Sequence, residues 1–259
     1  MISLVDTRHK FLLELNIFSH KHLNLLFLAM EASFWFKSWD LGGFYTSFHR
    51  RDIHPYVLQY MSPEEIEGKN ILVPLCGKTV DMMYLSQFAN RVIGVELVEK
   101  AIIQFFEENN LKYEQTDEET YISGNITLLK TDFMALQKQR LGTIDWVLDR
   151  ASLVALPYEM RTEYIRTLDR ITDVGTKQLV VTLEYSPLIN SAPFCIKPSE
   201  IENYYGAGHI INHVEQPNLP NHGMIKKWNL DFLIEHGFVL IKYANEGILQ
   251  EHIAENMVC

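Results

Sequence analysis

The sequence predicts one α/β domain built on a mostly parallel, twisted sheet with helices on both faces. From Ile71 onward, short β-branched runs alternate with amphipathic stretches, which is the pattern of β-α-β units. The 259 residues are long for one domain and short for two, and such a fold would use most of them. Hydrophobic residues make up 47% and charged residues 22%, an ordinary globular composition.

Apolar runs rich in β-branched residues mark the expected strands. In chain order they are Asn70–Pro74, Arg91–Glu96, Ile126–Lys130, Ile144–Leu148, Lys177–Leu183, His209–Glu215 and Phe238–Tyr243. The acidic segment Tyr113–Tyr121 is expected to be a solvated hairpin or loop without a functional site. A proline-containing loop follows Glu184. It lies at the carboxyl end of the fifth strand, where open α/β sheets bind ligands, so it is either a substrate lid or a plain surface loop.

Helices are expected between these strands. A helix at Val98–Asn109 has its apolar residues at helical spacing and stops at a pair of asparagines. Another begins at Pro157, placed at the first helical position, and carries an apolar stripe for the core. Ser62-Pro63-Glu64-Glu65 has the spacing of a capping box, so a short helix should start there and end at Gly68. A further short helix is expected at Ser199–Tyr205.

Charge and cysteine content exclude several classes of protein. The formal net charge of -10 would repel phosphate backbones, and no basic run interleaved with aromatic residues occurs, so we expect no nucleic-acid partner. The three cysteines are scattered and odd in number, which favours a reducing compartment over a disulfide framework. We therefore expect a soluble, cytoplasmic and monomeric protein that acts on a small molecule.

Residues 1–29 differ from the rest of the chain. Two apolar patches, Phe11–Phe18 and Leu23–Met30, are separated by polar residues, and neither is long enough to span a bilayer. A secretory signal would need one continuous apolar stretch, which is missing. We expect residues 1–29 to be a dispensable extension, either a short docking helix or a segment upstream of a functional start at Met30. Residues 30–259 would form the domain.

The turn after the first strand, Leu75-Cys76-Gly77-Lys78, bears on the cofactor. Dinucleotides need a glycine-rich turn that lets the backbone approach a pyrophosphate, and this turn contains one glycine. NAD and FAD are therefore disfavoured. S-adenosylmethionine has no phosphates and tolerates a looser turn. Gly77 would let the backbone approach the methionine part of that cofactor, or it has only a conformational role. Cys76 is interpreted as a packing residue.

Two polar positions at the ends of other strands fit the same interpretation. Glu96 ends the second strand, where an acid can accept hydrogen bonds from both ribose hydroxyls; the alternative is a helix-capping glutamate. Asp149 and Arg150 follow the fourth strand. They form either a local salt bridge or a site in which Arg150 clamps the carboxylate of the cofactor's methionine end.

Four segments in this order resemble the signature of thiopurine S-methyltransferases. They are Phe34-Trp35-Phe36-Lys37-Ser38-Trp39, Val73-Pro74-Leu75-Cys76-Gly77-Lys78-Thr79-Val80-Asp81-Met82, Gly94-Val95-Glu96-Leu97 and Asp149-Arg150-Ala151-Ser152-Leu153-Val154-Ala155-Leu156. The Pro-Leu-Cys-Gly-Lys run is the most diagnostic. The resemblance covers roughly Met30 to Tyr243. It departs from the family at Gly42-Gly43, where two extra residues separate Trp39 from Phe48-His49.

The resemblance implies a class I methyltransferase fold, Rossmann-like, with an N-terminal cap over S-adenosylmethionine. By resemblance, Trp39 lies against the methionine portion, Leu75 lines the cofactor through its backbone, and Glu96 holds the ribose. Asp132 and Phe133 fall where the family contacts adenine, Arg150 lies near cofactor and substrate as the catalytic residue, and Phe48 and His49 contact the substrate.

The implied reaction is methyl transfer to a small aromatic or heterocyclic thiol. Displacement at a sulfonium is in line and needs no covalent enzyme intermediate, so alignment supplies most of the acceleration. An acidic thiol arrives largely as its anion, and Arg150 or His49 would stabilise or relay charge. Two alternatives stay open: a methyltransferase for selenium or tellurium acceptors, and a non-catalytic module that binds S-adenosylmethionine.

Overall fold

The computed structural model describes residues 32–46 and 50–243. The chain divides into two compact units, Met1–Ser47 and Phe48–Cys259. In the first, residues 32–41 are helical and are followed by the short 3-10 helix η1 (Gly43–Thr46). The division expected at residues 29 and 30 lies outside the described residues and stays a prediction, as does the role of the N-terminal segment as a cap.

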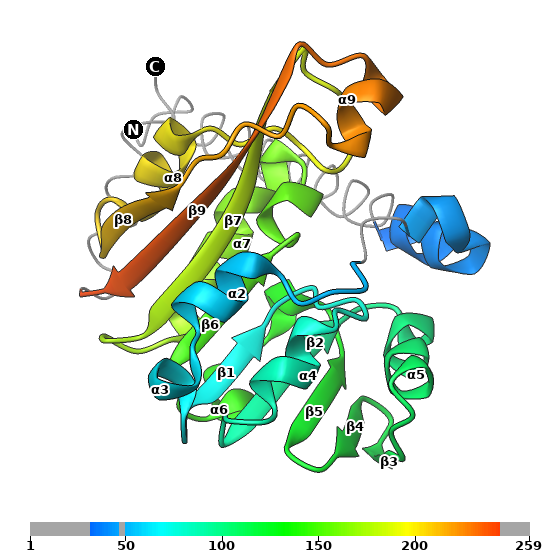
Figure 1. Ribbon diagram of the computed structural model, residues 1–259. Coiled ribbons are helices and arrows are strands. Elements are labelled where there is room, and N and C mark those ends of the chain that lie inside the picture. The colour runs from blue at the N-terminus through cyan, green and yellow to red at the C-terminus, as the bar shows by residue number, and fades with distance from the viewer. Residues whose placement is uncertain (1–31, 47–49, 244–259) are drawn as a thin grey trace, which may run out of the picture. The chain divides into compact units, whose positions relative to one another are not determined.

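The second unit is built on one nine-stranded sheet with the order β3-β4-β5-β2-β1-β6-β7-β9-β8 (Figure 1). Five central strands, β5, β2, β1, β6 and β7, are parallel, and β9 runs antiparallel between β7 and β8. The strands are β1 (Asn70–Val73), β2 (Arg91–Glu96), β3 (Glu114–Asp117), β4 (Thr120–Ser123), β5 (Ile126–Lys130), β6 (Trp146–Arg150), β7 (Lys177–Ser186), β8 (His209–Glu215) and β9 (Phe232–Lys242). The expected mostly parallel α/β sheet is confirmed.

Helices cover both faces of this sheet. They are α2 (Pro55–Tyr60), α3 (Pro63–Ile66), α4 (Asp81–Leu85), α5 (Glu99–Glu108), α6 (Lys138–Leu141), α7 (Tyr158–Ile171), α8 (Pro198–Tyr205) and α9 (Gly223–Trp228), with the 3-10 turns η2 (Phe133–Ala135) and η3 (Leu153–Ala155). Apolar residues of α2, α4 and α5 pack on one face, and those of α7 and α8 on the other. Among the described residues no helix has the length and apolarity needed to cross a membrane.

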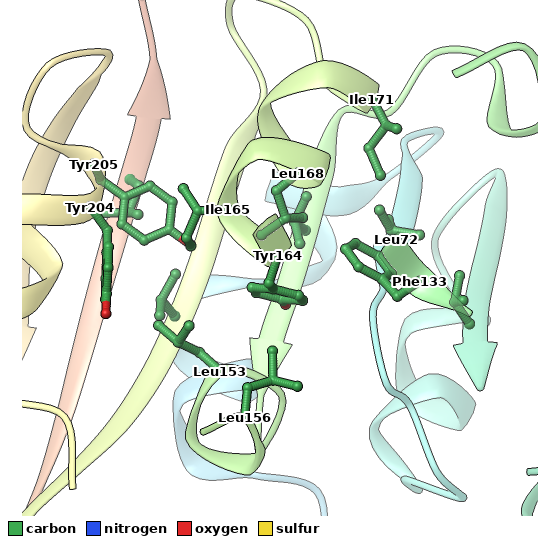
Figure 2. Packing of buried hydrophobic residues seen from close by; sticks show 14 of the residues in the cluster. Leu72, Phe133, Leu153, Leu156, Tyr164, Ile165, Leu168, Ile171, Tyr204 and Tyr205 are labelled. Atoms are coloured by element: carbon green, nitrogen blue, oxygen red, sulfur yellow. The ribbon is translucent and has the colours of Figure 1, made fainter. Parts of the chain in front are cut away.

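The face under α7 shows how the alternation of the strands builds the core (Figure 2). Tyr164, Ile165 and Leu168 form one stripe of α7 and are buried in the same core cluster as Leu72 of β1. Leu72 faces this side, whereas its neighbours Ile71 and Val73 belong to the core of the opposite face. The stripe predicted for this helix is thus core packing.

Several element ends differ from the prediction for identifiable reasons. The strand expected at Ile144–Leu148 is shifted to Trp146–Arg150, because Asp145 instead binds the backbone N–H of Asn70 with its carboxylate at 2.8 Å. β7 and β9 are longer than expected, because they pair with each other along the whole length of β7, from Lys177 to Ser186. Tyr113–Tyr121 forms most of the expected hairpin, in which all of β3 is exposed.

Two helix starts also differ. Ser62 is the N-cap of α3, but its hydroxyl donates to the carboxylate of Glu64 at 2.8 Å, so the capping box does not form. Pro157 is the N-cap of α7 and not its first helical residue, since its ψ of 157° is extended. The helix expected at Val98–Asn109 is confirmed as α5, with these two residues as its caps.

Candidate active site

The carboxyl ends of β1 and β6 contain an unusual concentration of left-handed backbone. Leu75, Gly77 and Ala151 have φ of +44°, +51° and +62°. For Leu75 and Ala151 this conformation is strained, and such strain gathers at functional sites. The sheet order also changes direction here, since β1 lies between β2 and β6. Open α/β sheets bind ligands at this switch point, so both features indicate the same place.

Glu96, the last residue of β2, is joined to the turn after β1. Its Oε2 accepts the backbone N–H of Gly77 at 2.9 Å, and its Oε1 accepts that of Val98 at 2.8 Å. Burial raises the pKa of Glu96 to about 7, against the opposite effect of these N–H donors. A carboxylate has about four acceptor positions, so lone pairs remain for a ligand. The alternative of a capping contact is therefore seen at Val98, while the ribose contact of Glu96 stays a prediction for its remaining acceptor positions.

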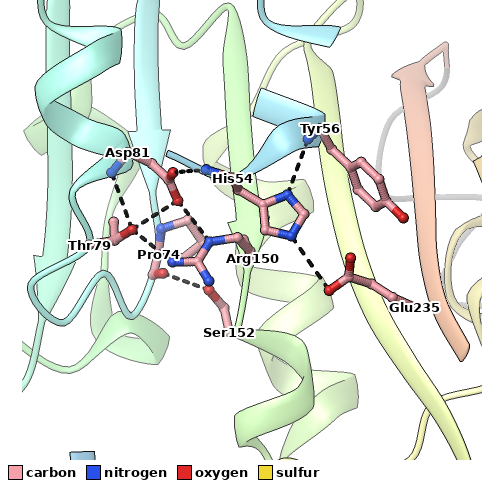
Figure 3. A network of polar contacts seen from close by, with 8 residues as sticks. All are labelled: His54, Tyr56, Pro74, Thr79, Asp81, Arg150, Ser152 and Glu235. Carbon is pink, nitrogen blue, oxygen red and sulfur yellow. Dashed lines mark hydrogen bonds and ion pairs between the residues drawn. The ribbon is translucent and has the colours of Figure 1, made fainter. Parts of the chain in front are cut away.

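Arg150, the last residue of β6, is held by α4 and the turn before it (Figure 3). Its Nε donates to Oδ2 of Asp81 at 2.7 Å, and its Nη2 donates to the hydroxyl of Thr79 at 2.8 Å. These two groups occupy the side edge of the guanidinium, which is formed by Nε and Nη2. Among the described residues no partner is found for Nη1, so the terminal edge can still donate to a ligand.

Asp149 is not the partner of Arg150. Its Oδ1 accepts the backbone N–H of Leu153 at 3.0 Å, and its Oδ2 accepts the hydroxyl of Tyr164 at 2.8 Å. Burial raises the pKa of Asp149 to about 6, which the hydrogen bonds from Leu153 and Tyr164 partly offset. Adjacent residues of a strand point to opposite faces, so Asp149 lies toward α7 and Arg150 toward α4. The alternative of a local Asp149–Arg150 salt bridge is thus wrong.

Asp132 and Phe133 lie just beyond β5, whose Lys130 pairs with Glu96. Asp132 is exposed, and its Oδ1 caps η2 by accepting the N–H of Met134 at 2.9 Å. The ring of Phe133 is buried, with its centroid 5.0 Å from that of Tyr164. For a ligand at this edge, the side chain of Asp132 and only the backbone of Phe133 are therefore available.

For the other residues predicted from the sequence, the structure gives their location but fewer contacts. Leu75 is half-buried in the strained turn after β1. Trp39 lies in the helix of the first unit, at residues 32–41. Phe48 and His49 lie outside the described residues, so their assignment to the substrate stays a prediction. Cys76 is buried, and burial raises the pKa of its thiol well above the ordinary value. Its sulfur packs beside Gly94, where an added Cβ would lie only 2.7 Å from the sulfur.

The structure adds residues that the sequence did not single out. Asp81 is buried beside Arg150, and its Oδ1 accepts the backbone N–H of His54 at 2.8 Å. The sequence does contain a signal for Asp81, because an acidic residue is favoured at the N-terminus of a helix such as α4. For His54 the only signal is its position before Pro55, since proline is common at a first helical position. Among the described residues no group of His, Cys, Asp or Glu could hold a metal ion.

Known proteins resemble this chain in sequence and in fold. The family model of thiopurine S-methyltransferase matches residues 30–242. The thiopurine S-methyltransferase of Pseudomonas aeruginosa is 38% identical over 192 residues, which cover 72% of this chain and 87% of that protein. The one of Shewanella frigidimarina is 36% identical over 180 residues, 68% of this chain and 81% of that protein. A solved SAM-dependent methyltransferase of Anabaena variabilis shares the fold at a TM-score of 0.53 and 15% identity, over 82% of this chain and 94% of that one.

Proposed function

Because the chain belongs to the thiopurine S-methyltransferase family and is an S-adenosylmethionine-dependent methyltransferase, we propose that it methylates the sulfur of small aromatic or heterocyclic thiols. The resemblance drawn from four sequence segments is confirmed by the family match. The fold is that of class I methyltransferases. The thiol acceptor is the proposal, and it takes its chemistry from the names of the relatives.

The structural observation that supports the cofactor part of the proposal is the contact between Glu96 and Gly77, 2.9 Å from carboxylate to N–H. It joins an acid with spare acceptor positions to a turn whose backbone is open to close approach. S-adenosylmethionine offers ribose hydroxyls as further donors to the buried carboxylate of Glu96, beyond the backbone N–H groups of Gly77 and Val98. We assign the ribose to Glu96, the adenine amino group to Asp132 and the adenine ring edge to the backbone of Phe133. Leu75, Gly77 and Trp39 are assigned to the methionine part.

Arg150 is proposed to act where cofactor and acceptor meet. When bound, S-adenosylmethionine supplies a methyl group on a positively charged sulfonium. With its side edge fixed by Asp81 and Thr79, Arg150 presents its terminal edge for the thiolate or for a carboxylate. An acidic thiol needs no strong base, so the protein's task is to bind and align the acceptor for in-line attack. Phe48 and His49 are proposed to contact that acceptor.

The assay that tests this proposal is a panel of acceptors with methyl-labelled S-adenosylmethionine. We expect transfer to thiopurines and thiophenols and little transfer to the matched oxygen compounds. Preference for a selenol or an oxyanion-derived tellurium species would overturn the thiol assignment and favour the alternative acceptors. Binding of the cofactor with no transfer to any acceptor would identify a binding module. The proposal takes the protein as a cytoplasmic monomer that needs neither nucleic acid nor a membrane.

A further inference from the structure

We infer that His54 and Glu235 are positioning residues for Arg150, which they hold through Asp81. The inference rests on the proposed role of Arg150 at the site. Figure 3 shows the contacts in order, from Arg150 at the end of β6 through Asp81 and His54 to Glu235 on β9. Two strands that are not neighbours, β6 and β9, are thereby connected on one face of the sheet.

Asp81 is the centre of these contacts. Its side chain is 1% exposed, and it accepts hydrogen bonds from Arg150 and Thr79 on Oδ2 and from the backbone N–H of His54 on Oδ1. A buried carboxylate depends on its donors, because each one lost leaves charge without compensation. If the N–H of His54 moves, the carboxylate of Asp81 must reorient. The guanidinium that it holds then moves with it.

The imidazole ring of His54 is fixed from two sides. Its Nδ1 accepts the backbone N–H of Tyr56 at 3.2 Å, which caps the start of α2. Since Nδ1 is an acceptor there, the hydrogen of the neutral ring is on Nε2, which faces Oε2 of Glu235 at 3.5 Å. Both ring nitrogens are therefore engaged inside the protein. His54 suits a positioning role and not proton transfer to a bound acceptor.

Glu235 joins these contacts to β9. Burial acts to raise the pKa of Glu235. The hydrogen bond from His54 and the nearby basic side chains of Arg50 and His222 outweigh burial, so the pKa of Glu235 is lowered. Glu235 is thus an ionised acceptor for the ring of His54. Two residues further on the same face, a Cβ at Gly237 would approach the ring of Tyr56 within 3.1 Å. Because Gly237 has no side chain, the ring of Tyr56 can pack close to β9. This packing and the His54–Glu235 contact hold the start of α2 against β9.

The test compares Glu235→Ala, Glu235→Gln and a matched control. In the full-length protein we expect Glu235→Ala to lower kcat about fivefold or more at saturating cofactor and acceptor, because small displacements of an aligning group are costly. Glu235→Gln should recover to within about twofold, since an amide oxygen still accepts from His54. The control is Glu184→Ala, which removes a Glu–His contact of 3.0 Å on the opposite face of β9. It should lower Tm and leave kcat within about twofold.

The possible outcomes separate the two proposals. If Glu235→Ala lowers Tm but keeps the wild-type kcat, or if Glu184→Ala lowers kcat equally, the His54–Glu235 pair is only structural and the inference is overturned. If Arg150→Ala itself keeps the wild-type kcat, the proposed role of Arg150 fails and takes the inference with it. If Glu235→Ala does not fold, His54→Asn is measured instead. Asparagine still caps α2 but cannot reach Glu235, so the same fall in kcat is expected.

Discussion

The carboxylate of Glu96 accepts the backbone N–H of Gly77 at 2.9 Å, so the acid that ends β2 is bonded to the turn that follows β1. One strand thus fixes the loop of its neighbour, at the point where the sheet order changes direction. A ligand that hydrogen-bonds to this acid is placed over that turn. We propose that this arrangement binds the cofactor without a glycine-rich phosphate loop.

Glu96→Ala should mainly weaken cofactor binding. Above pH 7, where Glu96 is ionised, losing hydrogen bonds to this buried group costs about 1.5–3 kcal/mol, or about ten- to more than a hundred-fold in Kd. Calorimetric titration with S-adenosylhomocysteine measures this. Glu99→Ala is the control, because Glu99 lies three residues later and its contacts are to Tyr121 and Lys130. Unchanged affinity in Glu96→Ala would remove Glu96 from the site.

The same residue predicts how stability depends on pH. The pKa of Glu96 rises from 4.5 to about 7 on folding, so between these values the folded protein holds a proton that the unfolded chain has released. Stability contributed by this proton is present at low pH and is lost as pH rises through about 7. Relative to Glu96→Gln, the wild type without cofactor should therefore lose free energy of unfolding from pH 5 to pH 8. Urea unfolding measures this difference, and a constant value across the range would contradict the raised pKa.

The expectations that succeeded depend on local pattern. Short apolar runs predicted β2 and β5 with both ends correct, because central parallel strands are covered on both faces and are nearly continuously apolar. Glu96 was predicted at the end of β2 for the same reason. The end of a predicted strand gives the position of a polar residue even when its hydrogen-bond partners are not known.

The partner of Arg150 could not be predicted in this way. Asp81 lies 69 residues earlier, and nothing local connects the two. The neighbouring Asp149 was the local candidate, and it failed because β6 extends through both residues. Had the strand been placed at Trp146–Arg150 from the start, alternation alone would have put Asp149 and Arg150 on opposite faces. His54 and Glu235 are farther apart still, and only the fold brings them together.

Tyr164→Phe should destabilise the fold through Asp149. It removes the hydroxyl that donates to the fully buried carboxylate at 2.8 Å, which costs about 1–3 kcal/mol. Tyr205→Phe is a matched control, because Tyr205 is equally buried and its hydroxyl has no hydrogen-bond partner among the described residues. That change should cost less than about 0.5 kcal/mol. Urea unfolding at pH 7 decides between them, and equal costs would show that Asp149 does not depend on Tyr164.

Arg150→Ala should lower turnover at saturating cofactor about tenfold or more, since it removes the donor edge proposed for the reacting groups. Arg150→Lys should recover only part of the loss, because an ammonium keeps the charge beside Asp81 but lacks the planar fork. Steady-state kinetics and Tm are measured for both variants. If Arg150→Ala lowers only Tm, the Arg150–Asp81 pair is structural and the active-site assignment has to move to the loop that follows β7.

The most direct test of the central claim follows the methyl group itself. The wild-type protein is mixed with methyl-labelled S-adenosylmethionine and a thiopurine in a single turnover, and both products are quantified. We predict that the label appears on the thiopurine sulfur as a thioether, with one S-adenosylhomocysteine formed for each. The claim would be contradicted if the protein bound the cofactor and the label stayed on it, or if the label appeared on a ring nitrogen and not on sulfur.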